Sequence, residues 1–425
     1  MWDDNRVMLF KFSAYGFLKN LRFFEPFLYL FFLANGLSYL QIGILISIRE
    51  ISVNLLEIPT GIVADMTGRR RAMAIAFASY MASFTAFYRF SGFYPFIPAM
   101  VLFALGETFR SGTHKSMIMT HLDREEMSDR KVEYYGKTRS ASRLGSALSA
   151  LIAALIVFEW QDYNVVFLAT LVPYSLGFLL MFTYPSELDG QIAKRTSLSE
   201  VRTHISNSIS QLRHSPGLAR MLANSSIYDS FFTISKDYLS PIVKRYAVML
   251  PVLLYIGNVE ERTAIMVGIV YFFVYMCSFV ASRRSYALLR RVGNMATALN
   301  VLYLVLAVSF LLIAVSLGMG WVMVSIAGFF LLFILYNIRK PMVVGYLGDR
   351  IQPQTRATLL STQNQTVSVV GIFIAPALGY LADAYGIAYT FGFGALVLLV
   401  SGLILPIRDE TYRGANRDPV PPGSQ

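Results

Sequence analysis

The stretch GIVADMTGRRR, residues 61–71, stands between two predominantly apolar blocks, and it decides the fold. The blocks run over residues 39–62 and 72–92, and each is long enough for a membrane-crossing helix, which needs about 20 apolar residues. Gly68 permits a tight turn, and three arginines, Arg69 to Arg71, follow it directly. The stretch therefore predicts two transmembrane helices joined by a short, positively charged turn.

The same alternation of apolar blocks and short charged stretches continues along the whole chain. The 425 residues are 55% hydrophobic and 15% charged, whereas soluble proteins carry roughly a quarter charged residues. Alternating strand patterns are absent, so helices must satisfy the backbone within the membrane. The pattern predicts an all-α polytopic membrane protein of twelve transmembrane helices in two six-helix halves. The expected spans are 13–35, 39–62, 72–92, 96–118, 138–158, 164–184, 218–241, 262–282, 295–316, 321–341, 359–381 and 387–407.

Four regions follow from this division. Residues 1–190 form an N-terminal six-helix half, and residues 217–407 form a C-terminal six-helix half. Residues 191–216 carry an apolar stripe at helical spacing, which predicts an amphipathic linker helix on the inner membrane surface; a packed soluble linker helix is the alternative. The tail, 408–425, is rich in proline and is expected to be disordered.

The net charge of +11 is distributed as a topology signal. Basic residues gather in alternate loops, which is the positive-inside pattern and places both termini in the cytoplasm. The basic residues in question are Arg69, Arg70, Arg71, Lys194, Arg195, Arg283, Arg284, Arg290, Arg291, Arg350 and Arg356. One stretch breaks the pattern: Lys244, Arg245 and Arg262 follow the seventh span. The charge therefore indicates a multi-pass protein of the cytoplasmic (inner) membrane and no nucleic-acid partner, with the first span serving as an uncleaved insertion signal.

The 61–71 stretch resembles the signature of the major facilitator superfamily, Gly-x-x-x-Asp-Arg/Lys-x-Gly-Arg/Lys-Arg/Lys, although Met66 replaces its first basic residue. Further local resemblance lies at Ser111-Gly112-Thr113, at 356–361 and from Pro376 to Asp383. The resemblance implies a transporter without enzymatic activity or cofactor. It also implies a cytoplasmic gate that latches the two halves together when the protein faces outward.

The residues expected at this gate are Gly61, Asp65, Gly68, Arg69 and Arg70, with Glu57 and Arg139 close by. Gly61 is expected to let a neighbouring helix approach, and Asp65 to pair with the arginines that follow it. A basic loop that only sets topology is the alternative.

Ionisable residues inside the expected spans are costly, so they face a cavity or find partners. The resemblance implies that spans 1, 4, 7 and 10 line the central cavity. Lys19, Arg22 and Glu25 recur every third residue and are expected to share one face of span 1, and Glu107, Arg110 and His114 one face of span 4. The expected substrate-binding residues are Lys19, Arg22, Arg110, His114, Lys115, Asp229 and Asn337.

Arginine suits carboxylate or phosphate because its planar fork bonds two oxygens at once. The cations therefore predict an anionic solute, while pairing with nearby carboxylates in a purely structural role is an equal alternative. Proton coupling requires a buried, perturbed acidic group, and Glu25, Glu50 and Glu107 are the candidates.

The sequence thus predicts a monomeric secondary transporter that moves a small anionic solute across the lipid bilayer by alternating access, coupled to protons. The alternatives are proton-antiport efflux of hydrophobic or cationic compounds, and a lipid-handling or receptor protein on the same scaffold. No Ser/His/Asp order or phosphate-cradling loop indicates an enzyme. His114 and His121 have no further ligand nearby in sequence, so no metal site is expected.

Overall fold

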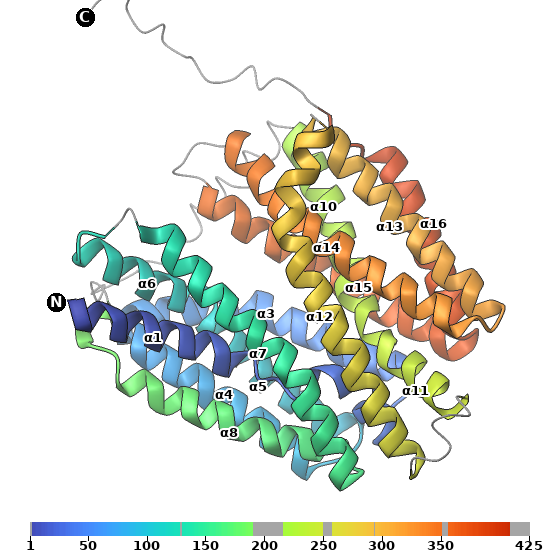
Figure 1. Cartoon of the computed structure of the whole chain (residues 1–425), viewed down its shortest axis with the longest axis horizontal. Helices are drawn as coiled ribbons and strands as arrows, with labels where there is room; N and C mark the ends of the chain where they lie inside the picture. Colours follow the sequence, from blue (N-terminus) through green and yellow to red (C-terminus); the bar gives the residue numbers. More distant parts are fainter. Residues whose placement is uncertain are drawn as a thin grey trace, which may run out of the picture.

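A computed structural model describes residues 2–127, 130–189, 216–249, 257–292, 294–350 and 356–408, and in these ranges the chain is helical (Figure 1). The elements of the first half are α1 (Trp2–Lys19), η1 (Glu25–Phe27), α2 (Leu28–Ala34), α3 (Tyr39–Thr67), α4 (Arg69–Arg89), α5 (Phe93–Arg110), α6 (Thr113–Arg124), α7 (Lys131–Trp160), α8 (Val165–Phe182) and η3 (Ser186–Asp189). Those of the second half are α10 (Pro216–Ser235), η4 (Lys236–Tyr238), α11 (Leu239–Met249), α12 (Val259–Val292), α13 (Met295–Gly318), α14 (Val322–Arg350), α15 (Arg356–Ala384) and α16 (Ile387–Ile404). The expected linker helix and tail lie outside the described residues.

The described helices make twelve passes, which agrees with the predicted fold class. Seven single helices in these ranges are long and apolar enough to cross a membrane by themselves, namely α7, α8, α12, α13, α14, α15 and α16. Large apolar side chains remain exposed on their outer surfaces, among them Leu155, Phe373 and Leu403. Such a surface suits a lipid environment, in which exposed apolar groups cost nothing.

Local sequence explains where α3 begins and ends. The Ser38 hydroxyl accepts a hydrogen bond from the Gln41 amide, and the Gln41 side chain accepts one from the Ser38 amide, which makes a complete capping box. At the other end Gly68 adopts a φ of +91°, a conformation that side chains other than glycine rarely adopt. The tight turn predicted at Gly68 is therefore present, and α4 begins at the next residue.

Three passes are interrupted, and here the predicted continuous spans are wrong. The first pass stops at Lys19 and resumes through η1 and α2, so Lys19, Arg22 and Glu25 do not share one helical face. The fourth pass stops at Arg110, because Gly112 has a φ of +74°, and resumes as α6. The seventh pass changes to a 3-10 turn at η4 before α11.

The two halves meet along two helix pairs, α3 with α15 and α7 with α12. We call the end of the bundle that holds the Gly68 turn the termini side, and the end that holds residues 35–38 and 161–164 the opposite side. In Figure 1 the helices of each pair lie close together toward the opposite side. On the termini side, the ends of α14 and α15 in the second half lie away from α6 in the first half.

Glycines explain the close packing at the opposite side. A Cβ atom at Gly43 of α3 would lie 2.7 Å from the Ala375 carbonyl carbon of α15, and one at Gly379 would lie 2.7 Å from the Tyr39 carbonyl carbon. The Asp383 carboxylate at the end of α15 accepts the backbone amides of Tyr39 (2.9 Å) and Leu40 (2.8 Å). It thus satisfies two of the amides left free at the N-terminus of α3. The opposite side is therefore closed.

Candidate functional site

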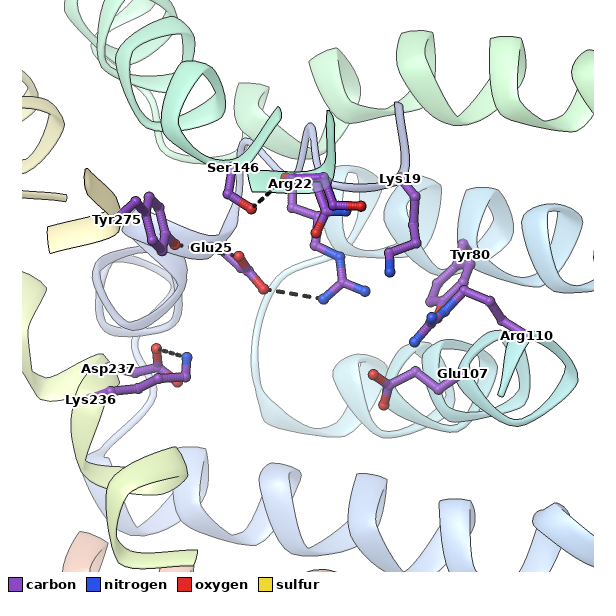
Figure 2. Close-up of polar contacts among 12 residues, drawn as sticks. Lys19, Arg22, Glu25, Tyr80, Glu107, Arg110, Ser146, Lys236, Asp237 and Tyr275 are labelled. Carbon is purple, nitrogen blue, oxygen red and sulfur yellow. Dashed lines mark hydrogen bonds and ion pairs between the residues drawn. The ribbon is translucent and has the colours of Figure 1, made fainter. Parts of the chain in front are cut away.

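Charged residues gather at the three helix breaks. Lys19 and Arg110 are the last residues of α1 and α5, Glu25 opens η1, and Lys236 and Asp237 form η4. Figure 2 shows these side chains directed toward a common space between the two halves, with Tyr80 and Glu107 beside Arg110. Interrupted helices place polar backbone and charged ends at mid-membrane depth, as transporters require for binding solutes and ions.

Arg22 is held by both a carboxylate and a phenol. Its Nη1 lies 3.1 Å from Glu25 Oε1, and its Nε donates to the Tyr174 hydroxyl at 3.2 Å. The Tyr174 hydroxyl in turn donates to the Lys19 carbonyl (3.2 Å), which lies at the open C-terminus of α1. Across the interface the Tyr275 hydroxyl of α12 donates to Glu25 Oε2 at 3.4 Å (Figure 2). Glu25 therefore links the break in the first pass to the second half.

A second charged group lies on α3. Arg49 forms an ion pair with Glu50, and its Nε lies 4.0 Å from Glu107 Oε2. The Ser368 hydroxyl of α15 donates to the other Glu50 oxygen. Glu50 therefore has a partner in its own half, Arg49, and one in the other half, Ser368. The contact between Glu107 and Arg49 is longer.

Lys19 and Arg110 differ from these groups. Among the described residues, neither forms an ion pair with a carboxylate, and the Arg110 Nε donates to the neutral Tyr80 hydroxyl at 3.1 Å. Each stands in the last turn of its helix, where the carbonyl ends carry a partial negative charge that stabilises a cation. The site consequently keeps two cations that form no ion pair with the carboxylates of the described residues.

The central side chains remain accessible. The exposed fraction of the side chain is 33% for Glu25, 25% for Glu107 and 23% for Arg49. Three tyrosines close the way toward the opposite side: Tyr238 of η4 stacks on Tyr39 with ring centroids 5.5 Å apart, and lies 5.0 Å from Tyr29 of α2. We call these three residues the tyrosine plug. Access to the central charges therefore lies on the termini side.

The second-half residues predicted to bind substrate are engaged with protein partners. Asp229 is buried and accepts a hydrogen bond from Lys340 Nζ at 2.8 Å, so this pair ties α10 to α14. Asn337 accepts one from Arg143 Nη2 at 3.1 Å and thereby links α14 to α7 across the halves. In the conformation described here, Asp229 and Asn337 therefore bind protein partners and not a solute.

His114 and Lys115 lie on α6, beyond the break, so they do not continue the face of Glu107 and Arg110 as predicted. The His114 ring is buried, stacks on Tyr15 with centroids 3.6 Å apart and lies 3.3 Å from the Tyr184 hydroxyl. Lys115 is exposed and its Nζ lies 5.7 Å from the centre of the Tyr135 ring. His114 thus packs against Tyr15, which lies beside Arg110 of the central site, and Lys115 lies near α7. Within the described ranges no three His, Cys, Asp or Glu side chains come together as a metal site would need.

The predicted gate residues form contacts mostly within the first half. Arg70 pairs with Asp189 of η3 (2.9 Å), whose carboxylate also accepts the Arg70 amide, and Arg69 donates to the Thr120 hydroxyl at 2.5 Å. In the described part of the chain Asp65 forms no ion pair with these arginines, so the expected pairing is wrong for this conformation.

Two further expectations for the gate differ from the structure. A Cβ at Gly61 would meet nothing within 4 Å, so no helix approaches there. Glu57 does reach the second half, since Gln365 Nε2 donates to it at 3.0 Å. For Arg139 no ion pair is found within the described ranges. Apart from Glu57, these gate residues form no hydrogen bond or ion pair with α15 among the described residues.

Sequence reasoning missed the tyrosines and the carboxylates that organise these sites. Tyr80, Tyr174 and Tyr275 orient the central charges, and Asp189 and Asp383 cap α4 and α3. The chain has 25 tyrosines, so residue type alone carried no signal for the three that matter here. The partners are also far apart in sequence, and only the packing of helices joins them.

The two halves repeat one arrangement. Arg110 contacts Tyr80 of the third pass and lies beside Tyr15 of the first. In the second half Arg339 of α14 lies over the ring of Tyr228 (4.1 Å) and near that of Tyr303 (5.7 Å), which belong to the corresponding passes. This is what a parallel repeat about an axis along the membrane normal gives. Arg339, however, is only 1% exposed, so Arg110 is the more accessible of these two arginines.

The family model of the Major Facilitator Superfamily matches residues 12–376. Similar solved structures include the nucleoside transporter NupG (12% identity, TM-score 0.75, covering 93% of this chain and 98% of that chain) and a D-xylose-proton symporter (12%, 0.69, 95% and 97%). A POT family transporter in complex with 5-aminolevulinic acid is similar too (16%, 0.68, 93% and 94%), as is a variant of the peptide transporter POT in complex with sulfate (15%, 0.70, 93% and 93%). At these identities the likeness is one of fold. No curated protein sequence matches.

Proposed function

The chain belongs to the major facilitator superfamily, whose members are secondary transporters without enzymatic activity, and we propose that it moves a small anionic solute by proton-coupled alternating access. The observation that carries this proposal is the pair of cations, Lys19 and Arg110, that face one accessible space without a carboxylate partner among the described residues. A solute carboxylate or phosphate supplies the missing negative charge.

The chemistry of the pair suits such a group. The Arg110 Nε donates to the Tyr80 hydroxyl and the Tyr15 hydroxyl lies close to the same guanidinium, so these two tyrosines hold the group in place to donate to a carboxylate or phosphate oxygen. Lys19 adds a mobile point charge from the adjacent helix end, and the paired Arg22 lies beside both (Figure 2). A variant of a peptide transporter of the same fold has been crystallised in complex with sulfate.

Glu25 is the best placed of the three carboxylates to couple protons to transport. It lies at a helix break, is partly exposed, and joins Arg22 of the first half to Tyr275 of the second. Protonation of Glu25 removes the charge that holds Arg22 and weakens the bridge between the halves. Solute binding and the movement of the halves would then depend on one proton, which is the coupling a symporter needs.

Loop charges support placing the termini side in the cytoplasm. Arg69, Arg70 and Arg71, at the start of α4, lie on that side. With the opposite side closed by the tyrosine plug and by the Asp383 cap, the conformation described here is the inward-facing one. The disengaged latch at Asp65 agrees with this, because the latch is expected to close when the transporter faces outward.

The proposal is tested by proton flux in proteoliposomes with a pH-sensitive dye, against carboxylates, phosphate and sulfate and against lipophilic cations. We expect an anion to evoke proton movement and Arg110→Gln or Lys19→Gln to weaken its apparent affinity about tenfold or more, since a hydrogen bond to a charged group contributes about 1.5–3 kcal/mol. Arg89→Gln, an exposed arginine at the end of α4, serves as the matched control and should leave transport unchanged. Flux evoked only by lipophilic cations, and lost in Glu107→Gln but kept in Arg110→Gln, would replace this proposal with drug efflux.

A further inference from the structure

Three cations contradict the charge pattern of the loops, and two of them line a pocket. Lys244 and Arg245 lie on α11, which ends on the opposite side, where the other loops carry almost no basic residues. The pocket has a volume of about 530 Å³ and lies between α2 and α11. This volume falls within the range of small-molecule sites, about 300–1,000 Å³.

The walls of the pocket are apolar and its cations stand together. Leu30 and Leu33 of α2, Tyr39 of α3 and Pro241 of α11 belong to its lining. Lys244 and Arg245 are neighbours in sequence and both belong to the lining. The pocket therefore combines an apolar chamber with a positively charged group, which is complementary to an amphiphilic anion.

The carboxylates nearby leave part of this charge unmatched. Glu260 of α12 lies 3.9 Å from Lys244 Nζ, which also lies 5.4 Å from the centre of the Tyr163 ring. Asp383 is engaged with the two α3 amides. Arg245 is exposed and, among the described residues, forms no ion pair. Glu260 lies beyond hydrogen-bonding distance of Lys244, so the positive charge of the pair is matched only in part.

The tyrosine plug separates this pocket from the central charges. Tyr39 belongs to both the plug and the pocket wall, and Tyr238 stacks on it from the side of η4. The pocket is consequently a second site, distinct from the one at Lys19 and Arg110, and it is present while the opposite side is closed.

We propose that the pocket between α2 and α11 binds an amphiphilic anion, with a phosphate or carboxylate head at Lys244 and Arg245 and a short apolar chain against Leu30, Leu33 and Pro241. This proposal does not depend on the transported solute, because binding can be measured without transport. The same head and chain occur in a free alkyl phosphate and in an anionic lipid of the membrane, and the test distinguishes the two sources.

The experiment measures protection of a cysteine at the pocket in nanodiscs. Val248 lines the pocket and is 44% exposed, and Cys277, the one cysteine of the chain, is removed, so the protein carries Val248→Cys and Cys277→Ser. The labelling rate with a polar maleimide is followed against hexyl phosphate, inorganic phosphate and hexyltrimethylammonium in phosphatidylcholine nanodiscs. A second series uses nanodiscs that contain phosphatidylglycerol and no added probe.

We expect protection by hexyl phosphate or by phosphatidylglycerol, and not by hexyltrimethylammonium. The combined Lys244→Gln and Arg245→Gln variant should weaken this protection about tenfold or more, because it removes two charged donors. Arg262→Gln is the control: this residue lies on the same side but outside the pocket, and it donates to the Gly257 carbonyl at 2.9 Å.

Protection by hexyl phosphate alone assigns the site to a free amphiphile, and protection by phosphatidylglycerol alone assigns it to a lipid. The proposal is overturned if neither protects, if the double variant is protected as well as the parent, or if inorganic phosphate protects equally at the same concentration. The last two outcomes would show that the charges or the apolar walls contribute nothing.

Discussion

Gly43 provides a direct test of how the opposite side is held closed. In the closed conformation a Cβ atom at this position would lie 2.7 Å from the Ala375 carbonyl carbon and 2.9 Å from the Pro376 Cα. Ordinary contacts of a Cβ begin at 3.4 Å, and the opposing atoms belong to backbone, which cannot rotate away as a side chain can. Gly43→Ala therefore forces α3 and α15 apart.

The size of the effect follows from the cost of overpacking, about 1–3 kcal/mol for an extra methyl group in a well-packed contact. In alternating access this cost falls on the closed conformation, because α3 and α15 separate at this end when the opposite side opens. The ratio of closed to open molecules should fall about 5- to 150-fold. The protein itself should stay folded, since the open conformation relieves the clash.

The assay measures distances between spin labels in the Cys277→Ser background. Labels at Glu159→Cys and Tyr385→Cys are both exposed and stand on the opposite side, one in each half. We expect Gly43→Ala to add a population at longer distance, and Gly136→Ala, where a Cβ would meet nothing within 4 Å, to leave the distribution unchanged. An unchanged distribution in Gly43→Ala, with the variant folded, would refute the argument that this contact holds the side closed.

A further prediction concerns stability. Lys340→Met leaves Asp229 buried without its partner at 2.8 Å, so we expect a loss of about 3–5 kcal/mol in thermal unfolding, which Asp229→Asn in the same chain should largely restore; equal stability of the single and double variants would contradict a paired role.

Several features of the fold could be predicted from the sequence, because they depend on local chemistry alone. The apolar blocks predicted the passes because membrane depth requires an apolar helix of a certain length, whatever surrounds it. The turn at Gly68 followed from the backbone freedom of glycine. The family likewise followed from a short stretch of sequence, residues 61–71.

The helix breaks were not predicted, and the break in the first pass involves partners that are remote in sequence. α1 ends where α7 lies against it: a Cβ at Gly145 would lie 2.6 Å from the Phe17 carbonyl oxygen. The carbonyl that the break leaves free at Lys19 is bonded by Tyr174, more than 150 residues away. A continuous apolar block does not reveal either contact, so periodicity alone favoured unbroken spans.

The sequence by itself determined that this chain is a twelve-pass helical transporter and which charges lie at membrane depth, because burial costs depend on residue type and position along a span. The tertiary structure alone decided how those charges are used. Glu25 and Glu50 found partners and Asp229 joined Lys340, whereas Lys19 and Arg110 form no ion pair among the described residues, although Glu107 lies beside Arg110. Pairing is a matter of distances of a few ångströms between separate helices, and those distances are fixed only when the helices pack.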